Sequence, residues 1–148
     1  MIPKIRVFAK AGVKSVFGGG YDTDQMFYEI RDIDFYDKEV TVWGCHHKDC
    51  GMCDDTYRIE DVEIMMSTGL KDKNGVEIYD RDIVKVTDDY GDTNFSDGGI
   101  GTICGLTDLY MWYIDGQVHN GLYDIDQCYY IEVIGNIYKN KELLEAMK

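Results

Sequence analysis

Short alternations of apolar and polar residues recur along the chain, whereas the periodicity of amphipathic helices is scarce. Valine, isoleucine, threonine and tyrosine concentrate in these runs, and turn-forming residues separate them. Because alternation places every second side chain on the same face of a strand, each run predicts a strand with one buried face. We therefore expect strands at residues 5–8, 27–35, 40–43, 62–66, 83–87, 101–104, 110–114 and 129–133.

Turn signals mark the connections between these strands. The clearest is Asn74-Gly75, because both residue types adopt the positive φ angles of a tight turn. Looser loops are expected at residues 18–24, 45–56 and 88–99. The three-glycine run in the first loop lacks the lysine and the serine or threonine of a phosphate-binding loop, so we expect it to serve the backbone conformation.

One helix is predicted, at residues 141–146 near the end of the chain. Asn140 is the expected N-cap, and Glu142 lies in the first turn, where the helix dipole favours negative charge. Leu143, Leu144 and Met147 would form its apolar side.

The length of 148 residues suits one domain with a hydrophobic core of its own. No linker rich in proline and serine divides the chain, so we expect a single domain over residues 1–148. A soft boundary between N-terminal strands and a C-terminal barrel is expected near residues 53–60, where the strand and turn signals become regular.

Composition and charge restrict the classes of function. The apolar fraction of 45% is typical of globular proteins, and no apolar run is long enough to span a bilayer. The start of the chain lacks the apolar core of a signal peptide, so we expect a cytoplasmic protein without membrane contact and with reduced cysteines. The net charge of −13 opposes direct binding to nucleic acid, which requires clustered lysine and arginine.

Two long motifs in the second half carry a family resemblance. The chain reads STGLKDKNGVEIYDRDIVKV from residue 67 and IEVIGNIYKNKELLE near its end. These stretches resemble the signature ends of the YopX family of bacteriophage and prophage proteins, approximately TGLKDKNGKEIYEGDIV and IEVIGNIYENPELLE. The closest agreement is at residues 68–75, 77–79, 82–84 and 131–138.

The resemblance implies a mainly β fold, in which additional N-terminal strands precede a small C-terminal β barrel of the Src-homology-3 type and one short C-terminal helix. The family usually has glycine where this chain has Arg81, so the turn there must adopt a conformation that a side chain tolerates. Lys141 stands where the family prefers proline. The family brings no established activity and no catalytic residue, and it implies the cytosol of a bacterial host.

The densest chemical signal is CHHKDCGMC at residues 45–53. Cys50 and Cys53 form a C-x2-C pair, and Cys45 with His47 or His46 would complete a four-ligand zinc set. The cysteine spacing also fits the first three ligands of a plant-type iron–sulfur loop, but bulky residues fill the first interval. Because compact zinc sites of this kind are unusual, we expect a surface loop without metal or cofactor and keep zinc as the alternative.

No catalytic constellation is apparent. Cys45 lies beside a histidine, but adjacent residues of a strand point to opposite faces, and no third residue is placed to orient a base. The aspartate-rich stretches lack the glycine and glutamate of a calcium loop. We therefore expect a protein that is not an enzyme.

Aromatic residues offer the best candidates for binding. The run YMWY at residues 110–113 would place alternate side chains outside a barrel, either Tyr110 with Trp112 or Tyr113 with Met111. Such an outward pair could anchor a protein partner or a second copy, so Tyr110, Trp112 and Tyr113 are the interface candidates. We accordingly expect an interaction protein rather than an enzyme. The alternatives are a zinc module built on residues 45–53, and an acidic mimic of nucleic acid that blocks a basic host protein.

Overall fold

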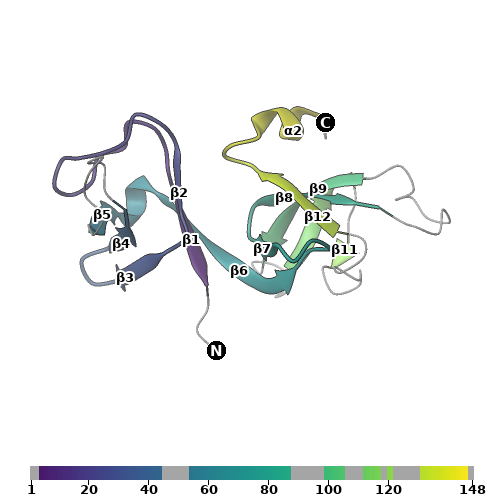
Figure 1. Cartoon of the computed structure of the whole chain (residues 1–148), viewed down its shortest axis with the longest axis horizontal. Helices are drawn as coiled ribbons and strands as arrows, with labels where there is room; N and C mark the ends of the chain where they lie inside the picture. The colour runs from purple at the N-terminus through teal and green to yellow at the C-terminus, as the bar shows by residue number, and fades with distance from the viewer. Residues whose placement is uncertain are drawn as a thin grey trace. The chain divides into compact units, whose positions relative to one another are not determined.

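The computed structural model describes residues 4–44, 54–87, 99–105, 112–117, 120–121 and 131–146. The described chain is mainly β with one short C-terminal α-helix, which confirms the predicted fold class (Figure 1). It divides into two compact units, Met1–Met66 and Ser67–Lys148. None of the helices in the described ranges has the length and apolar character needed to traverse a bilayer.

The first unit contains a three-stranded antiparallel sheet in which β4 (Glu39–Trp43) lies between β3 (Ile30–Asp34) and β5 (Asp54–Arg58). Strand β1 (Ile5–Ala9) pairs with β2 (Gln25–Phe27) and with the start of β6 (Glu63–Lys71). A 3-10 turn, η1 (Ile59–Asp61), follows β5.

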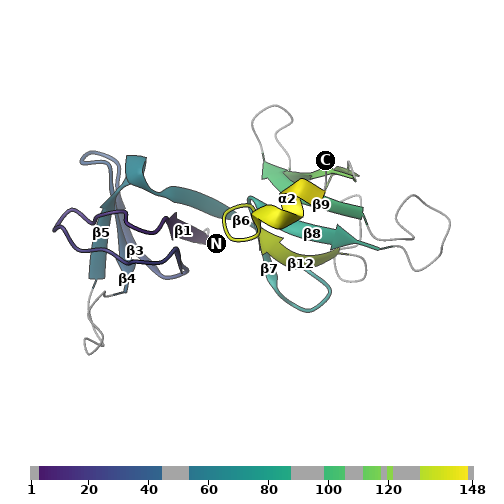
Figure 2. The ribbon, with the colours of Figure 1, turned by 90° about the horizontal axis from the view of Figure 1, so that it is seen from above.

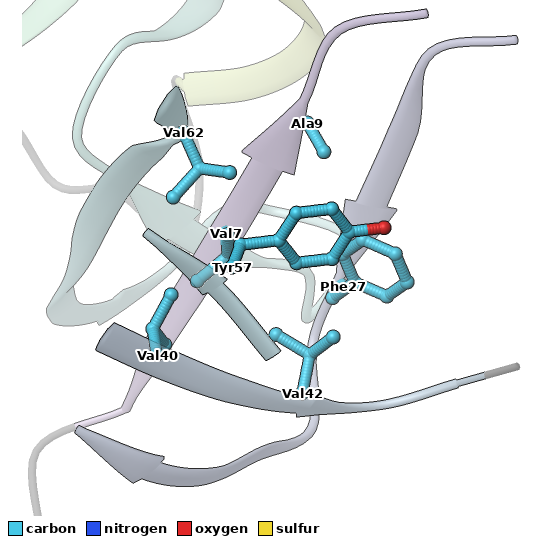
Figure 3. Packing of buried hydrophobic residues seen from close by; sticks show 7 residues of the cluster. All are labelled: Val7, Ala9, Phe27, Val40, Val42, Tyr57 and Val62. Atoms are coloured by element: carbon cyan, nitrogen blue, oxygen red, sulfur yellow. The ribbon is translucent and has the colours of Figure 1, made fainter. Parts of the chain in front are cut away.

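The core of the first unit collects the inward side chains of these strands, as Figure 3 shows. The ring of Tyr57 is fully buried among valines, and its centroid lies 6.0 Å from that of Phe27. Burial of these side chains supplies the main favourable free energy of folding. The buried cluster comprises Val7, Ala9, Phe27, Val40, Val42, Tyr57 and Val62.

The second unit is built on a five-stranded antiparallel sheet of order β11-β10-β9-β8-β12, which curls into a half barrel (Figures 1 and 2). The later residues of β6 pair with β7 in this unit. Its elements are β7 (Glu77–Tyr79), β8 (Asp82–Val86), β9 (Gly99–Gly105), β10 (Trp112–Gly116), β11 (Asn120–Gly121), β12 (Ile131–Asn136) and α2 (Lys141–Ala146).

The inner face of this sheet carries the second core. Alternate residues of β8 and β9 point inward because the side-chain period of a strand is two. Leu70, Trp112 and Val133 pack against the cluster. Its fully buried members are Ile78, Val84, Val86, Ile103, Ile114 and Ile131.

Several predicted elements need correction. The single strand expected at residues 27–35 is two strands, because Phe27 pairs with β1 whereas Ile30 pairs with β4. Residues 54–56, expected in a loop, begin β5, where the hydroxyl groups of Thr56 and Thr41 lie 2.9 Å apart across the strands. Strands β7 and β11 were not predicted, because each is too short to show an alternating pattern.

The Asn74-Gly75 turn forms, but in a different way from the prediction. Only Gly75 of the pair has a positive φ, 79°. The Gly75 N–H donates to the Asp72 carbonyl oxygen at 3.0 Å, and Oδ1 of Asp72 accepts from the N–H groups of Asn74 and Val76, both at 2.9 Å. The aspartate side chain therefore fixes the turn that Asn74 was expected to shape.

Helix α2 has the predicted bounds, and Asn140 directly precedes it, with its carbonyl oxygen accepting from the N–H of Leu143 at 3.0 Å, but the side chain of Asn140 bonds back to β12. Its side-chain Oδ1 accepts from the N–H of Asn136 at 3.1 Å, and its backbone N–H donates to the Asn136 carbonyl oxygen at 3.0 Å. A Cβ at Gly135 would overlap the Asn140 side chain, so the glycine permits this close approach. These hydrogen bonds join Asn136, at the end of β12, to Asn140, directly before α2.

Candidate functional site

The connection between β3 and β4 presents two adjacent aromatic side chains to solvent. Phe35 is 80% exposed and Tyr36 is 92% exposed. Oδ1 of Asp34 accepts from the N–H of Tyr36 at 2.9 Å and from the N–H of Asp37 at 3.0 Å. Lys38 completes the turn with a φ of 58°. We refer to residues 34–38 as the aromatic turn.

A groove of about 480 Å³ lies beside the aromatic turn. Its lining residues come from the end of the turn and the start of β4, and from the end of β5 and from η1. The Ile59 N–H donates to the Lys38 carbonyl oxygen at 2.9 Å, which joins these two segments. This turn groove is lined by Asp37, Lys38, Glu39, Arg58, Ile59 and Glu60.

Two cations near the aromatic turn have acidic or aromatic neighbours within the same sheet. The guanidinium of Arg31 lies 4.1 Å from the ring centroid of Trp43, and its Nε lies 3.4 Å from Oδ1 of Asp54. Glu39 and Arg58 face each other in the register of β4 and β5. Opposite charges on nearby strands offset each other, so Asp54 offsets Arg31 and Glu39 offsets Arg58. The other carboxylates near the turn therefore set the local net charge.

The core of the first unit holds an ionisable side chain in its neutral form. Tyr57 is fully buried and Asp55 is 4% exposed. Burial raises the pKa of the Tyr57 hydroxyl well above its ordinary value, and the neighbouring Asp55 carboxylate raises it further. A buried phenol of this kind supports the sheet and is not activated as a nucleophile.

The interface residues predicted from the sequence lie in the second unit. Trp112 and Ile114 share the core side of β10, and the Trp112 ring covers Gly105, where a Cβ would overlap it. Tyr113 is partly buried on the other face, opposite Cys104 in β9. Tyr110 lies outside the described residues. The structure thus separates Trp112 from Tyr113, and a role of these residues in an interface stays a prediction.

The predicted metal ligands Cys45, Cys50, Cys53 and His47 lie outside the described residues, as does His46. Within the ranges that the structure describes, no group of three or more histidine, cysteine, aspartate or glutamate side chains is placed to hold a metal ion. The zinc alternative therefore stays a prediction.

Cys104 lies within the described residues, and its surroundings disfavour the thiolate form of its side chain. Burial raises the pKa of the Cys104 thiol, and the carboxylates of Asp115 and Asp80 raise it further, against smaller lowering effects of Tyr113 and Arg81. The thiolate is the nucleophilic form of cysteine, so this environment keeps Cys104 in its unreactive form.

Arg81, which replaces the glycine of the family pattern, adopts a positive φ of 66°. Its Nη1 donates to the Tyr138 hydroxyl, its guanidinium lies 5.9 Å from the centroid of that ring, and its Nε lies 3.9 Å from Oδ2 of Asp80. The turn therefore adopts a left-handed conformation at a residue that has a side chain, as the sequence led us to expect. The Arg81 side chain joins the start of β8 to the segment after β12.

Sequence reasoning overlooked the aromatic turn because Phe35 was included in a long strand with a solvated face. The available signal is the order DFYDK at residues 34–38. An aspartate whose side chain can accept from the N–H groups two and three residues later favours a turn, and a turn exposes the aromatic residues between them. The position of the groove beside the turn depends on β5 and η1, which come about twenty residues later.

Comparison with known proteins gives the family. The family model described as YopX protein matches residues 20–145. A solved structure, that of protein EF1440 from Enterococcus faecalis, is similar in fold, with a TM-score of 0.54 and 22% sequence identity, over 97% of this chain and 99% of that one. A search of curated proteins found no significant match. Since the family model spans most of the sequence and both terminal motifs, the chain belongs to the YopX family.

Proposed function

We propose that the protein is a non-enzymatic interaction protein of a phage or prophage, acting in the cytosol of the bacterial host through contacts with another protein. The observation that carries the proposal is the aromatic turn, where Phe35 and Tyr36 are 80% and 92% exposed on a turn held by Asp34. Neighbouring exposed aromatic side chains are costly to keep in water and are enriched at protein interfaces.

The rigidity of the turn favours binding. Two hydrogen bonds from backbone N–H groups to one aspartate oxygen restrict the loop before any partner arrives, so less conformational entropy is lost on association. Aromatic side chains with few rotatable bonds add contact area at a low entropic cost. The adjoining turn groove gives a partner a concave surface next to the two rings.

The non-enzymatic part of the proposal is supported by two ionisable groups among the described residues, Tyr57 and Cys104. Burial raises the pKa of both Tyr57 and Cys104, so each is held in its neutral, less reactive form. Catalytic nucleophiles require the opposite shift or an adjacent base.

Photocrosslinking tests the proposal directly. A photoreactive amino acid is placed at position 36 in one full-length variant and at position 76 in a second, since Val76 is 48% exposed on a turn of the other unit. After irradiation in host cytosol, discrete protein adducts are expected from position 36 and not from position 76. A second copy of the chain would be recognised by the mass of the adduct. Equal labelling from both positions, or none from position 36, would contradict the proposal.

The zinc and mimicry alternatives have their own tests. A zinc module predicts nearly stoichiometric zinc after native purification and a lower melting temperature with a chelator, and metal-free folded protein would rule it out. A nucleic-acid mimic predicts that the protein competes with DNA for a basic host protein. Failure to displace DNA from any such protein would exclude mimicry.

A further inference from the structure

We infer that the segment recognised at the aromatic turn is basic, so that lysine or arginine side chains of a protein partner lie against Phe35 and Tyr36 while their charges face the carboxylates beside the turn. This inference rests on the proposed function and specifies the chemistry of its partner. The charge around the turn, the arrangement of the rings and the shape of the groove support it.

The charge near the turn is strongly biased toward carboxylates. Residues 31–39 and 58–63 form β3, the aromatic turn, the start of β4, the end of β5, η1 and the start of β6. They carry seven acidic residues and three basic ones, a net charge of −4. The acidic residues are Asp32, Asp34, Asp37, Glu39, Glu60, Asp61 and Glu63, and the basic ones are Arg31, Lys38 and Arg58.

The three cations do not reverse this bias. Arg31 is placed over Trp43 and beside Asp54, and Arg58 lies opposite Glu39 across the strands. Lys38 is next in sequence to Asp37, and both are exposed at the edge of the groove. Glu60 also lines the groove, from η1. A cation entering the groove therefore meets carboxylates from the turn and from η1, and complementary charge of this kind accelerates association and selects the partner.

Two exposed rings next to carboxylates are suited to cationic side chains. The face of an aromatic ring attracts lysine and arginine, and the attraction adds to the ion pairs formed with neighbouring carboxylates. Within the described residues, arginine makes this kind of contact with Trp43, through Arg31, and with Tyr138, through Arg81. Ile59 adds an apolar surface in the groove for the aliphatic part of such a side chain.

The test measures binding of the full-length protein to a short fluorescent peptide of alternating arginine and leucine. A matched peptide has citrulline in place of arginine, which keeps the shape and removes the charge. The protein variants are Phe35→Ala/Tyr36→Ala and Asp37→Asn/Glu60→Gln. The control variants are Phe17→Ala, which removes another ring that is 86% exposed, and Asp22→Asn/Glu142→Gln, which removes the same amount of charge elsewhere.

The arginine peptide is expected to bind with a Kd about tenfold weaker for the aromatic variant and about threefold weaker or more for the carboxylate variant, with controls within about twofold. Added salt should weaken binding to the wild type. Equal losses from both carboxylate variants would show that only the overall charge of −13 attracts the peptide and would overturn the inference.

The peptide experiment and the crosslinking experiment can fail separately. If the citrulline peptide binds as well as the arginine peptide, the partner is not selected by charge, and the inference is wrong while the aromatic turn remains an interaction surface. The same conclusion follows if crosslinking at position 36 identifies a partner segment that is neutral or acidic. If position 36 gives no adduct and neither peptide binds, both proposals fall. Thermal melting of each variant verifies that these exposed substitutions leave the fold intact.

Discussion

The carboxylate of Asp72 accepts a hydrogen bond from the backbone N–H of Val133, 61 residues later, at 2.9 Å. Asp72 is only 3% exposed, and its other oxygen holds the turn formed by residues 72–76. One side chain thus fixes the DKNG turn and docks it on β12, and it links the two motifs that mark the family.

Replacing Asp72 by asparagine should lower the free energy of unfolding by about 1–3 kcal/mol, because the amide NH₂ group cannot accept and leaves at least one buried N–H without its partner. The measurement is denaturant unfolding of Asp72→Asn beside Asp22→Asn, whose side chain is exposed in a loop. Equal stability of the two variants would show that the Asp72 bonds contribute no net stability.

Gly135→Ala should destabilise the second unit by roughly 1–3 kcal/mol, because the new Cβ would overlap the Asn140 side chain that accepts from Asn136. A double-mutant cycle with Asn140→Gly isolates this effect, since removal of the Asn140 side chain should make the alanine nearly neutral. Thermal unfolding provides the measurement. An alanine that costs the same in both backgrounds would locate the cause elsewhere than in this contact.

Stability should fall as the pH rises above the ordinary tyrosine pKa of about 10, since an unfolded Tyr57 loses its proton there while the folded one retains it. The pKa of Tyr57 is raised in the folded state, so its contribution is fully present below that pH and is lost above it, by at most about 1.4 kcal/mol per pH unit. Unfolding of Tyr57→Phe should show a shallower decline than the wild type. Tyr36→Phe, which changes an exposed tyrosine, is measured beside it as the matched control.

Cys104 should be alkylated by iodoacetamide severalfold more slowly at pH 8 than a cysteine in an unstructured peptide, because its raised pKa lowers the thiolate fraction. Asp115→Asn removes one cause of the shift and should accelerate the reaction, whereas Asp22→Asn should not. Mass spectrometry of the peptide that contains Cys104 gives the rate for this residue alone. Rapid alkylation of the wild type would contradict the raised pKa.

Local sequence patterns were sufficient to predict much of the fold. Alternation in EVTVW and DIVKV corresponds to β4 and β8, since in each strand the side chains of one face are buried. The same pattern did not separate β2 from β3, because the chain changes its pairing partner between Phe27 and Ile30 without a change in residue type. The strand with which each segment pairs, β1 for β2 and β4 for β3, lies outside the stretch of sequence that the local pattern covers.

For the candidate interaction surface too, local sequence patterns were not sufficient. In the run at residues 110–113, where an interface stays a prediction, Trp112 covers Gly105 because the register of β9 and β10 places them opposite each other. The sequence pattern attributed Phe35 to a strand, although Asp34 turns the chain there and leaves both aromatic residues in solvent.

The mainly β character, the short C-terminal helix and membership of the YopX family follow from the sequence alone, because alternation, turn chemistry and ordered motifs are properties of neighbouring residues. Which aromatic side chains are buried and which are exposed depends on how the strands pack in three dimensions. Tyr57 and Tyr36 have the same side chain, yet one is fully buried and the other is 92% exposed. The difference arises because burial is set by strands that are distant in the sequence and adjacent in space.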